Sequence, residues 1–193
     1  MDEAAKAGRP VRLCENARTH QGLLSRLRRM AAEEFRTIGD GKTAVIDENQ
    51  IPVSDSKSRR LVAIDGAHGG KAICLANDNW DWSTQFGLSQ VAFDPGARFR
   101  LRVRAKVDLG RESGPVLSAG VYDAGASKSV LRTNFDSKAV KADWAWYDIG
   151  IWDPNDRQYI WIAPGAFDRA RNPVSPAYDR IYIDELEISR VDR

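Results

Sequence analysis

The chain has 193 residues, which is enough for one domain with a full hydrophobic core, with or without a short appendage. Its 29 Lys and Arg residues nearly balance its 27 Asp and Glu residues, so overall charge predicts neither a nucleic acid nor a membrane surface as partner. No apolar run reaches the roughly 18 residues of a membrane span, and the first residues lack the basic and apolar regions of a signal peptide. We therefore expect either a cytoplasmic protein or a piece of a longer exported chain.

Motifs that carry enzymatic chemistry are absent from the sequence. Cys14 and Cys74 lie far apart and belong to no Cys-x-x-Cys motif, and His20 and His68 are isolated. There is no zinc-type cluster, no Ser/His/Asp set and no phosphate-binding glycine loop. The cysteines are interpreted as buried structural thiols, with a disulfide as the alternative. A standalone enzyme is therefore the least favoured of the functions considered.

Helical periodicity is confined to about residues 16–37. The apolar positions that recur there at helical spacing are Leu23, Leu27, Met30, Ala31, Phe35 and Ile38. They predict one N-terminal amphipathic α-helix that ends at Gly39 and Gly41. Glu33 and Glu34 interrupt its basic residues, so we expect the apolar stripe to pack on the rest of the chain rather than on a membrane or a nucleic acid.

After Gly41 the apolar pattern changes to the two-residue period of β-strands. About ten strands are predicted, separated by Gly, Pro, Asn or Asp. They are residues 43–46, 60–64, 71–76, 82–86, 98–107, 116–122, 129–135, 144–151, 159–163 and 180–189. Many strands without intervening helices predict an all-β, antiparallel β-sandwich or jelly roll. The predicted boundary separates a helical lead-in, residues 1–42, from a β-sandwich, residues 43–193.

The strand at residues 98–107 has the clearest alternation. The residues expected to face the core are Phe99, Leu101, Val103, Ala105 and Val107. The cations expected on the opposite face are Arg98, Arg100, Arg102, Arg104 and Lys106. This stripe is interpreted as a solvated outer face paired with acids on adjacent strands. The alternatives are a site for an anionic ligand, such as a uronate or sulfated glycan, and a nucleic acid. Arg102 and Arg104 are the ligand-binding candidates.

Four of the six tryptophans lie in residues 144–164, which predict an aromatic hairpin with a polar turn at residues 153–157. If the isoleucines point into the core, then Trp146, Tyr159 and Trp161 face outward. Flat aromatic rings stack on the apolar face of a pyranose, so these three side chains could form a sugar-binding platform.

Tryptophans are more often core than surface, which leaves a second interpretation of the hairpin. The same alternation places Trp152 on the face of Trp146. Outside the hairpin, Trp82 is expected in the core, while Trp80, flanked by Asn and Asp residues, is expected to be a loop contact. A long loop at residues 165–178 is a further possible recognition segment.

A succession of strand signatures runs through the β region, at residues 63–72, 82–86, 99–104, 119–123 and 159–164, and at the closing Ile181-Tyr182-Ile183-Asp184. Together these segments resemble the galactose-binding-domain-like jelly rolls, which include many carbohydrate-binding modules. The resemblance covers roughly residues 43–190 and is closest to the C-terminal sandwich of large glycosidase-like proteins of polysaccharide-degrading bacteria. It is carried by strand signatures and not by a catalytic motif.

This resemblance implies a non-catalytic module that targets a parent enzyme to a polysaccharide or oligosaccharide. The helix would then be the tail of a preceding domain in the same longer chain, and the protein would be a secreted or periplasmic monomer. The alternative function is a structural accessory sandwich that packs on a catalytic domain and binds no ligand of its own.

The resemblance also implies a structural calcium ion between an early loop and the final strand. Asp184 occupies the closing position, and Asp65 is the early counterpart, with Asp47 or Glu48 as other candidates. Calcium takes six to eight oxygen ligands, several of which would be backbone carbonyl groups. The alternative is that these carboxylates are ordinary turn caps.

Overall fold

The structure is a computed structural model that describes residues 37–52, 59–77, 84–110, 113–165 and 177–192. Residues 37–193 form one compact unit. Almost all of the predicted helix, together with Cys14, Trp80 and Trp82, lies outside the described residues. Within the described part of the chain, no helix is long and apolar enough to cross a membrane.

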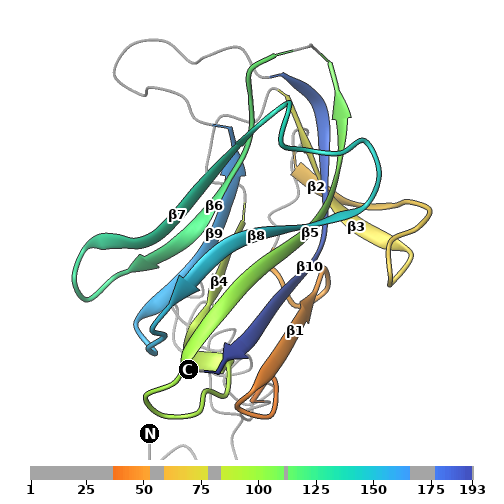
Figure 1. Ribbon diagram of the computed structural model, residues 1–193. Helices are drawn as coiled ribbons and strands as arrows, with labels where there is room; N and C mark the ends of the chain where they lie inside the picture. Colours follow the sequence, from red (N-terminus) through yellow and green to blue (C-terminus); the bar gives the residue numbers. More distant parts are fainter. Residues whose placement is uncertain (1–36, 53–58, 78–83, 111–112, 166–176, 193) are drawn as a thin grey trace, which may run out of the picture. The chain divides into compact units, whose positions relative to one another are not determined.

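Ten strands form two antiparallel sheets (Figure 1). The strands are β1 (Thr43–Asp47), β2 (Arg59–Ala63), β3 (Lys71–Ala76), β4 (Thr84–Gly87), β5 (Arg98–Leu109), β6 (Pro115–Asp123), β7 (Lys128–Asp136), β8 (Ala145–Trp152), β9 (Gln158–Pro164) and β10 (Tyr178–Val191), with a short 3-10 helix at Leu88–Gln90. The six-stranded sheet has the order β2-β3-β10-β5-β8, with β1 also paired to β10, and the four-stranded sheet has the order β4-β9-β6-β7. The all-β antiparallel prediction is confirmed, and each strand differs from its predicted range only near its ends.

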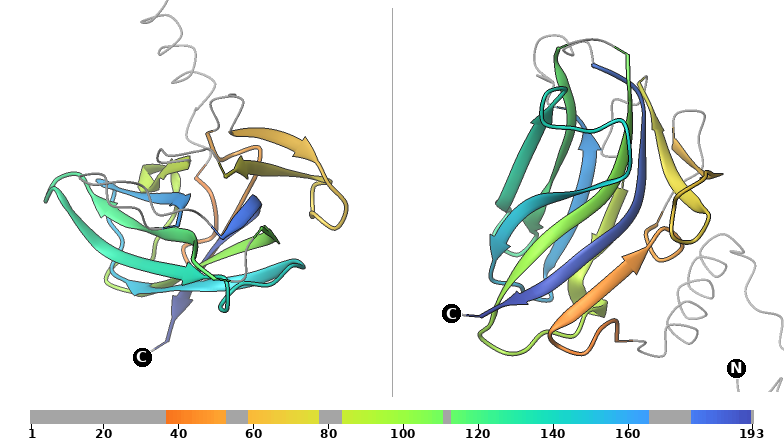
Figure 2. Two further views of the ribbon diagram at one scale, coloured as in Figure 1. Left: turned by 90° about the horizontal axis from the view of Figure 1, so that it is seen from above. Right: turned by 45° about the vertical axis from the view of Figure 1, so that its right-hand side comes forward.

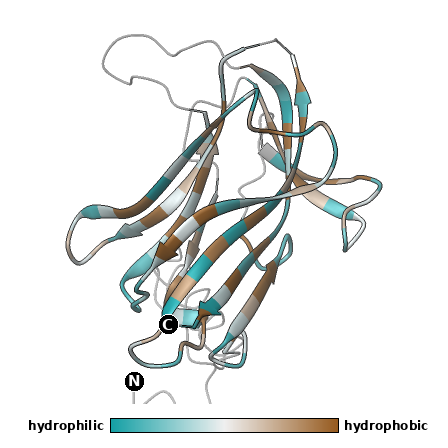
Figure 3. Cartoon of the chain, in the orientation of Figure 1, coloured by the Kyte–Doolittle hydropathy of each residue, from teal (hydrophilic) through white to brown (hydrophobic). Residues whose placement is uncertain are grey.

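The core lies between the two sheets and takes alternate residues from each strand. On β5 the five residues predicted to face inward are all at most 1% exposed. Leu117 and Ala119 of β6 and Ile160 and Ile162 of β9 belong to the same cluster from the other sheet. Figure 3 shows the alternation of hydrophilic and hydrophobic residues along the strands. Burying a side chain of this size contributes about 1.5–3 kcal/mol, so this shared core stabilises the sandwich.

The β2–β3 hairpin lies on the side of the domain away from β6 and β7 (Figure 2). It carries a small second cluster in which Ala72, Cys74 and Tyr182 are buried. Cys74 is a free thiol, and burial raises its pKa. The interpretation of Cys74 as a buried structural thiol is therefore confirmed.

The prediction of an aromatic hairpin at residues 144–164 is wrong, because β8 and β9 belong to different sheets. β8 pairs with β5, whereas β9 lies between β4 and β6. The polar turn between them crosses from one sheet to the other, a distance of about 10 Å that a few extended residues can span. Trp146 of β8 therefore lies on one outer face of the sandwich, and Tyr159 and Trp161 of β9 lie on the opposite outer face.

A β-bulge in β8 also changes which of its side chains face the core. Leu101 pairs with Gly150 and Arg102 with Asp148, which leaves Ile149 as the extra residue. Gly150 has a φ of +135°, a conformation that favours glycine. One extra residue reverses the alternation that follows. Trp152 is therefore 4% exposed and in the core, and its predicted place on the face of Trp146 is wrong.

Candidate functional site

The arginine stripe on the outer face of β5 is paired with acids from both neighbouring strands. Its ion pairs are Arg98–Asp153 (3.6 Å), Arg100–Asp148 (3.4 Å), Arg102–Glu187 (2.6 Å) and Arg104–Asp184. The interpretation as a paired outer face is therefore confirmed. Arg102 and Arg104, the predicted ligand contacts, form ion pairs with Glu187 and Asp184 of β10, and their binding of a ligand stays a prediction.

The same two arginines cover the tryptophans at the start of β8. The guanidinium carbon of Arg102 lies 5.2 Å from the ring centroid of Trp146, and that of Arg104 lies 4.9 Å from the ring of Trp144. Both tryptophans are half-buried. Trp146 faces outward as predicted, but one face of its ring already makes a cation–π contact, worth about 0.5–1 kcal/mol at an exposed site.

A bulge in β10 places two successive acids on this outer face. Ile183 pairs with Ala105 and Glu185 with Arg104, so that Asp184 is the extra residue. Asp184 is fully buried, and Glu185 is 9% exposed. In a regular strand, successive side chains point to opposite faces of the sheet. The bulge changes this alternation, so that two successive carboxylates lie on the same face.

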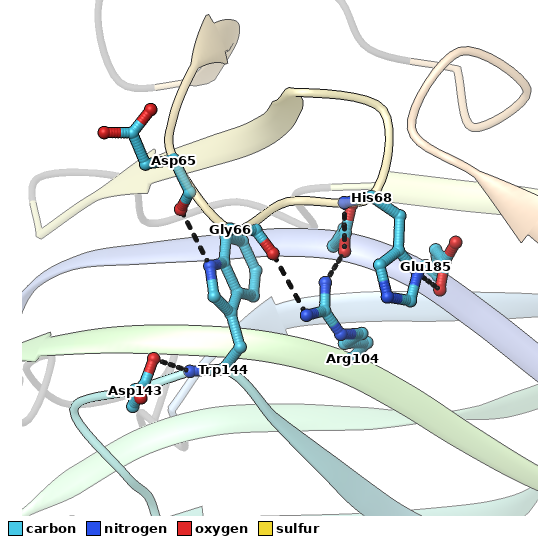
Figure 4. A network of polar contacts seen from close by, with 8 residues as sticks. Asp65, Gly66, His68, Arg104, Asp143, Trp144 and Glu185 are labelled. Atoms are coloured by element: carbon cyan, nitrogen blue, oxygen red, sulfur yellow. Dashed lines mark hydrogen bonds and ion pairs between the residues drawn. The ribbon is translucent and has the colours of Figure 1, made fainter.

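These carboxylates hold the loop between β2 and β3 against the sheet (Figure 4). Arg104 binds Asp184 through Nη1 and donates through Nη2 to the Gly66 carbonyl oxygen at 3.0 Å. The backbone N–H of His68 donates to Asp184 Oδ2 at 3.2 Å, and His68 Nδ1 lies 2.7 Å from Glu185 Oε2. The loop is thus fixed at both Gly66 and His68.

Trp144 adds a further contact to the same loop. Its Nε1 donates to the Asp65 carbonyl oxygen at 3.0 Å, and its backbone N–H donates to Asp143 Oδ1 at 2.7 Å. Asp65 therefore contributes its backbone, whereas its carboxylate points away from the network in Figure 4. The pairing of the Asp65 and Asp184 carboxylates around one ion therefore stays a prediction, and in the described network Asp65 contributes its carbonyl oxygen.

The group of described residues that could hold a metal ion is His68, Asp184 and Glu185. This donor set does not fit calcium, which prefers six to eight oxygen ligands over an imidazole nitrogen. Asp184 Oδ2 already accepts from Arg104 and from the His68 backbone, although its Oδ1 is buried without a partner. The arrangement fits an ion pair that fastens a loop better than it fits a calcium site.

The other two calcium candidates have local roles. Asp47 Oδ1 accepts from the backbone N–H groups of Asn49 (2.8 Å) and Gln50 (3.1 Å), as an ordinary turn cap does. Glu48 is 3% exposed and accepts from Asn49 Nδ2 at 3.0 Å. Its carboxylate lies against Gly69, where an added Cβ would come within 2.5 Å of Glu48 Oε1.

The outer face of the four-stranded sheet carries a pair of tyrosines. Tyr122 of β6 and Tyr159 of β9 are direct cross-strand neighbours, with ring centroids 5.4 Å apart and planes inclined by 35°. Both are half-buried, and neither hydroxyl group bonds to a residue that the structure describes. Burial, and secondarily Tyr122, raises the pKa of Tyr159, so the Tyr159 phenol is a neutral donor and acceptor at neutral pH.

Trp161 lies on the same face but is only 2% exposed. Its ring packs against Gly120, where an added Cβ would approach the indole to 2.8 Å. The guanidinium carbon of Arg132 lies 5.8 Å from the ring centroid. The predicted outward orientation of Trp161 is correct, but its ring is covered and offers no open face for stacking.

Arg132 is fixed by a short chain of hydrogen bonds across β6 and β7. Ser118 Oγ donates to Asn134 Oδ1 at 2.6 Å, and Arg132 Nε donates to the same oxygen at 3.3 Å. Arg132 and Asn134 are exposed, whereas Ser118 is buried. The face therefore combines half-buried aromatic rings with exposed polar groups, which is the composition expected of a small-molecule or sugar site.

The predicted platform of Trp146, Tyr159 and Trp161 is thus divided between two faces. Tyr122 and Arg132 were missed from the sequence, although both occupy outward positions of predicted strands. Alternation predicts that both side chains face outward. Only the strand pairing shows that Tyr122 lies beside Tyr159 and that Arg132 lies in line with Gly120 and Trp161. Trp80 is outside the described residues.

No protein-family model matches the sequence, and no curated protein matches it. Solved structures do resemble the chain. Carbohydrate-binding modules are among them. The CBM22-1 xylan-binding domain of Paenibacillus barcinonensis Xyn10C is 11% identical and has a TM-score of 0.46, over 82% of this chain and 91% of that domain. The module CBM36 in complex with calcium and xylotriose is 14% identical and has a TM-score of 0.45, over 76% of this chain and 99% of the module.

A further match is the insecticidal delta-endotoxin Cry8Ea1 of Bacillus thuringiensis, with 16% identity and a TM-score of 0.50. It covers 83% of this chain but only 26% of the endotoxin, so the similarity concerns one part of that protein. At these identities the likeness describes the fold.

Proposed function

We propose that the β-sandwich is a non-catalytic carbohydrate-binding module whose glycan lies on the outer face of the four-stranded sheet. The observation that carries this proposal is the Tyr122–Tyr159 pair, two adjacent half-exposed rings 5.4 Å apart on neighbouring strands. Their ring faces stack on the C–H face of a pyranose, and their hydroxyl groups bond to its hydroxyls. Rigid strands hold both rings, so little conformational entropy is lost on binding.

Polar side chains around the tyrosines supply the orienting contacts. Gln85 of β4 is exposed on one side of β9, and Asn134 of β7 is exposed on the far side of β6. The Gln85 amide can both donate and accept, and the Asn134 NH2 group can donate while its oxygen accepts from Ser118 and Arg132. The proposed site therefore spans all four strands of this sheet.

The wider biological role follows from the sequence resemblance. The module would belong to a longer secreted or periplasmic protein, act as a monomer, and hold a parent polysaccharide-degrading enzyme near its substrate. Similar structures include a xylan-binding domain and a module bound to xylotriose, so xylan and xylooligosaccharides are the first glycans to test.

At the loop between β2 and β3, Arg104 takes the role that a calcium ion was expected to fill. Its guanidinium supplies the positive charge beside the buried Asp184 and reaches the Gly66 carbonyl group of the loop. An internal cation of this kind fastens the loop without a metal, so glycan binding should not require calcium.

One observation favours the alternative, a structural sandwich that packs on a catalytic domain and binds no ligand. The tryptophans that the structure describes are covered: Trp152 and Trp161 are at most 4% exposed, and Trp144 and Trp146 lie under arginines. The carbohydrate-binding function requires that a sugar stacks on Tyr122 and Tyr159, whereas the structural function requires no ligand at these rings.

Affinity electrophoresis and calorimetry against a panel of plant and algal polysaccharides separate them. The proposed function predicts weak binding to at least one glycan, and a loss of roughly tenfold or more for Tyr159→Ala, since stacking of a ring contributes about 1–3 kcal/mol. Trp146→Ala, on the opposite sheet, is the matched control and should leave affinity unchanged. Absence of binding to every glycan, with and without calcium, would exclude the proposal.

A further inference from the structure

We infer that the glycan bound on the four-stranded sheet carries a carboxylate, as a uronic acid does, and that Arg132 binds this group. The inference rests on the proposed function and adds the chemical class of the ligand. It comes from a contrast between the arginines of the two outer faces.

On the six-stranded sheet, the arginines of β5 have acidic partners at every position from Arg98 to Arg104. Arg132 has none: no acidic side chain in the described ranges forms an ion pair with it, and its side chain is exposed. The neighbouring outward residues in the middle of this sheet are uncharged, namely Gln85, Ser118, Tyr122, Asn134, Tyr159 and Trp161. Among the residues that the structure describes, Arg132 is therefore a positive charge without an acidic partner on the face that carries the aromatic pair.

The orientation of the Arg132 guanidinium is also restricted. Asn134 Oδ1 holds its Nε at 3.3 Å and is itself fixed by Ser118 Oγ at 2.6 Å, while the buried ring of Trp161 lies 5.8 Å away. The two terminal NH2 groups have no hydrogen-bond partner among the described residues. A guanidinium held at Nε with two free terminal groups forms the planar fork that binds a carboxylate through two parallel hydrogen bonds.

The register places this fork within reach of a sugar on the tyrosines. Arg132 pairs with Gly120, which lies two residues before Tyr122 on β6. Two residues span about 7 Å along a strand, and neighbouring strands lie about 5 Å apart. A long arginine side chain covers such a distance, so the carboxylate belongs to the sugar stacked on the tyrosines or to the next unit of the chain.

The test compares acidic oligosaccharides with their neutral counterparts by calorimetry. Suitable pairs are tetragalacturonate with its methyl ester, a glucuronic-acid-substituted xylooligosaccharide with xylotetraose, and a cellouronate with cellotetraose. For at least one pair, wild-type protein should bind the acidic member roughly tenfold to hundredfold more tightly, which is the range of charge-assisted hydrogen bonds. This preference should weaken in high salt.

Three variants assign the effect to Arg132. Arg132→Gln should bring the affinity for the acidic member down to that for the neutral one, and Arg132→Lys, which keeps the charge but not the fork, should give an intermediate value. Arg98→Gln removes the same charge from the opposite sheet and should change neither affinity.

Equal affinities for the acidic and neutral members in wild-type protein would overturn this inference and leave the proposed function intact. An acidic preference that survives in Arg132→Gln would overturn it as well. Binding of no oligosaccharide of either kind would overturn the inference together with the proposed function. Tighter binding of a sulfated galactan than of every uronate would exclude the carboxylate.

Discussion

The indole Nε1 of Trp152 donates a hydrogen bond of 3.0 Å to Oε1 of Gln158, which joins the last residue of β8 to the first residue of β9. This contact spans the corner at which the chain leaves one sheet and enters the other. The corner separates Trp144 and Trp146, on the outer face of one sheet, from Tyr159 and Trp161, on the outer face of the other. The Trp152–Gln158 hydrogen bond fastens the two strands where the chain changes sheet.

Removing the side-chain amide of Gln158 should destabilise the fold. Gln158 is 4% exposed, and its amide also contacts the Asn155 backbone N–H (3.2 Å) and the Asp153 carbonyl oxygen (3.3 Å). Gln158→Ala leaves these groups and the Trp152 indole unpaired, so we expect the free energy of unfolding to fall by about 1–3 kcal/mol. Urea denaturation measures the change. Gln90→Ala, at an exposed position, is the control, and an equal effect in both variants would contradict the role of the corner.

Arg104 and Arg98 offer a matched comparison between a buried and an exposed ion pair. Arg104→Gln leaves the fully buried Asp184 without its counter-charge, and we expect a loss of about 3–5 kcal/mol of folding free energy. In the Arg98–Asp153 pair the side chains are 57% and 81% exposed, so Arg98→Gln should change stability by less than about 1 kcal/mol. Denaturation curves of the two variants give both values. Similar small effects would show that Arg104 does not fasten the loop.

Removal of calcium should leave the domain unchanged. The acids of β10 are paired with Arg104 and His68, and the Asp65 carboxylate is turned away. We therefore expect the same melting temperature in excess calcium and in a chelator. Arg104→Gln provides a second measurement. This variant leaves Asp184 without the Arg104 guanidinium, so added calcium should raise its melting temperature. A wild-type melting temperature that falls in chelator and recovers with calcium would contradict the fit described above.

Stability should decline at alkaline pH, in part because of Tyr147. This side chain is 5% exposed, and burial raises its pKa above the ordinary 10.0, with a smaller opposing effect from the Lys141 backbone N–H. Between the two pKa values the unfolded chain has lost the proton and the folded protein has kept it, so stability falls as pH rises. The contribution is complete below pH 10 and is lost as pH passes through the raised pKa.

Denaturation of wild type and Tyr147→Phe across pH 8 to about 11.5 tests this dependence. The variant loses the hydrogen bond to Lys141 and is less stable at pH 8, but its stability should decline less steeply above pH 10. Tyr122→Phe is the control, because Tyr122 is only half-buried, whereas the other described candidate, Tyr178, is fully buried. Equal slopes in wild type and Tyr147→Phe would contradict the assignment.

The strands and their inward faces could be predicted from the sequence because side-chain alternation is a local property. β5 shows this most clearly, with Phe99 to Val107 inward at every second residue. The sequence also predicts that the arginines of β5 pair with acidic residues on adjacent strands. Their identities, Asp148, Asp184 and Glu187, depend on β8 and β10 being the neighbours of β5, which is set by long-range pairing.

Two kinds of feature escaped prediction for physical reasons. A bulge inserts one residue without a distinctive local signal, so neither the inward turn of Trp152 nor the adjacent acids Asp184 and Glu185 followed from alternation. A polar turn also looks alike whether it joins strands of one sheet or carries the chain to another. Alternation therefore predicts one sugar-binding platform of Trp146, Tyr159 and Trp161, although Trp146 lies on the other sheet, and it does not predict that Tyr122 is the neighbour of Tyr159.

The position of β10 has a consequence for how the chain folds. β10 is the last of the ten strands, yet it pairs with β1, β3 and β5 and so joins the two halves of the six-stranded sheet. β1 and β3 are synthesised long before β10, so the strand edges that pair with β10 stay unpaired until it has been made. Contacts between such distant segments form slowly, and unpaired edges invite association with other chains. The six-stranded sheet can therefore form only after β10 has been synthesised, and a variant without β10 would expose the edges of β1, β3 and β5.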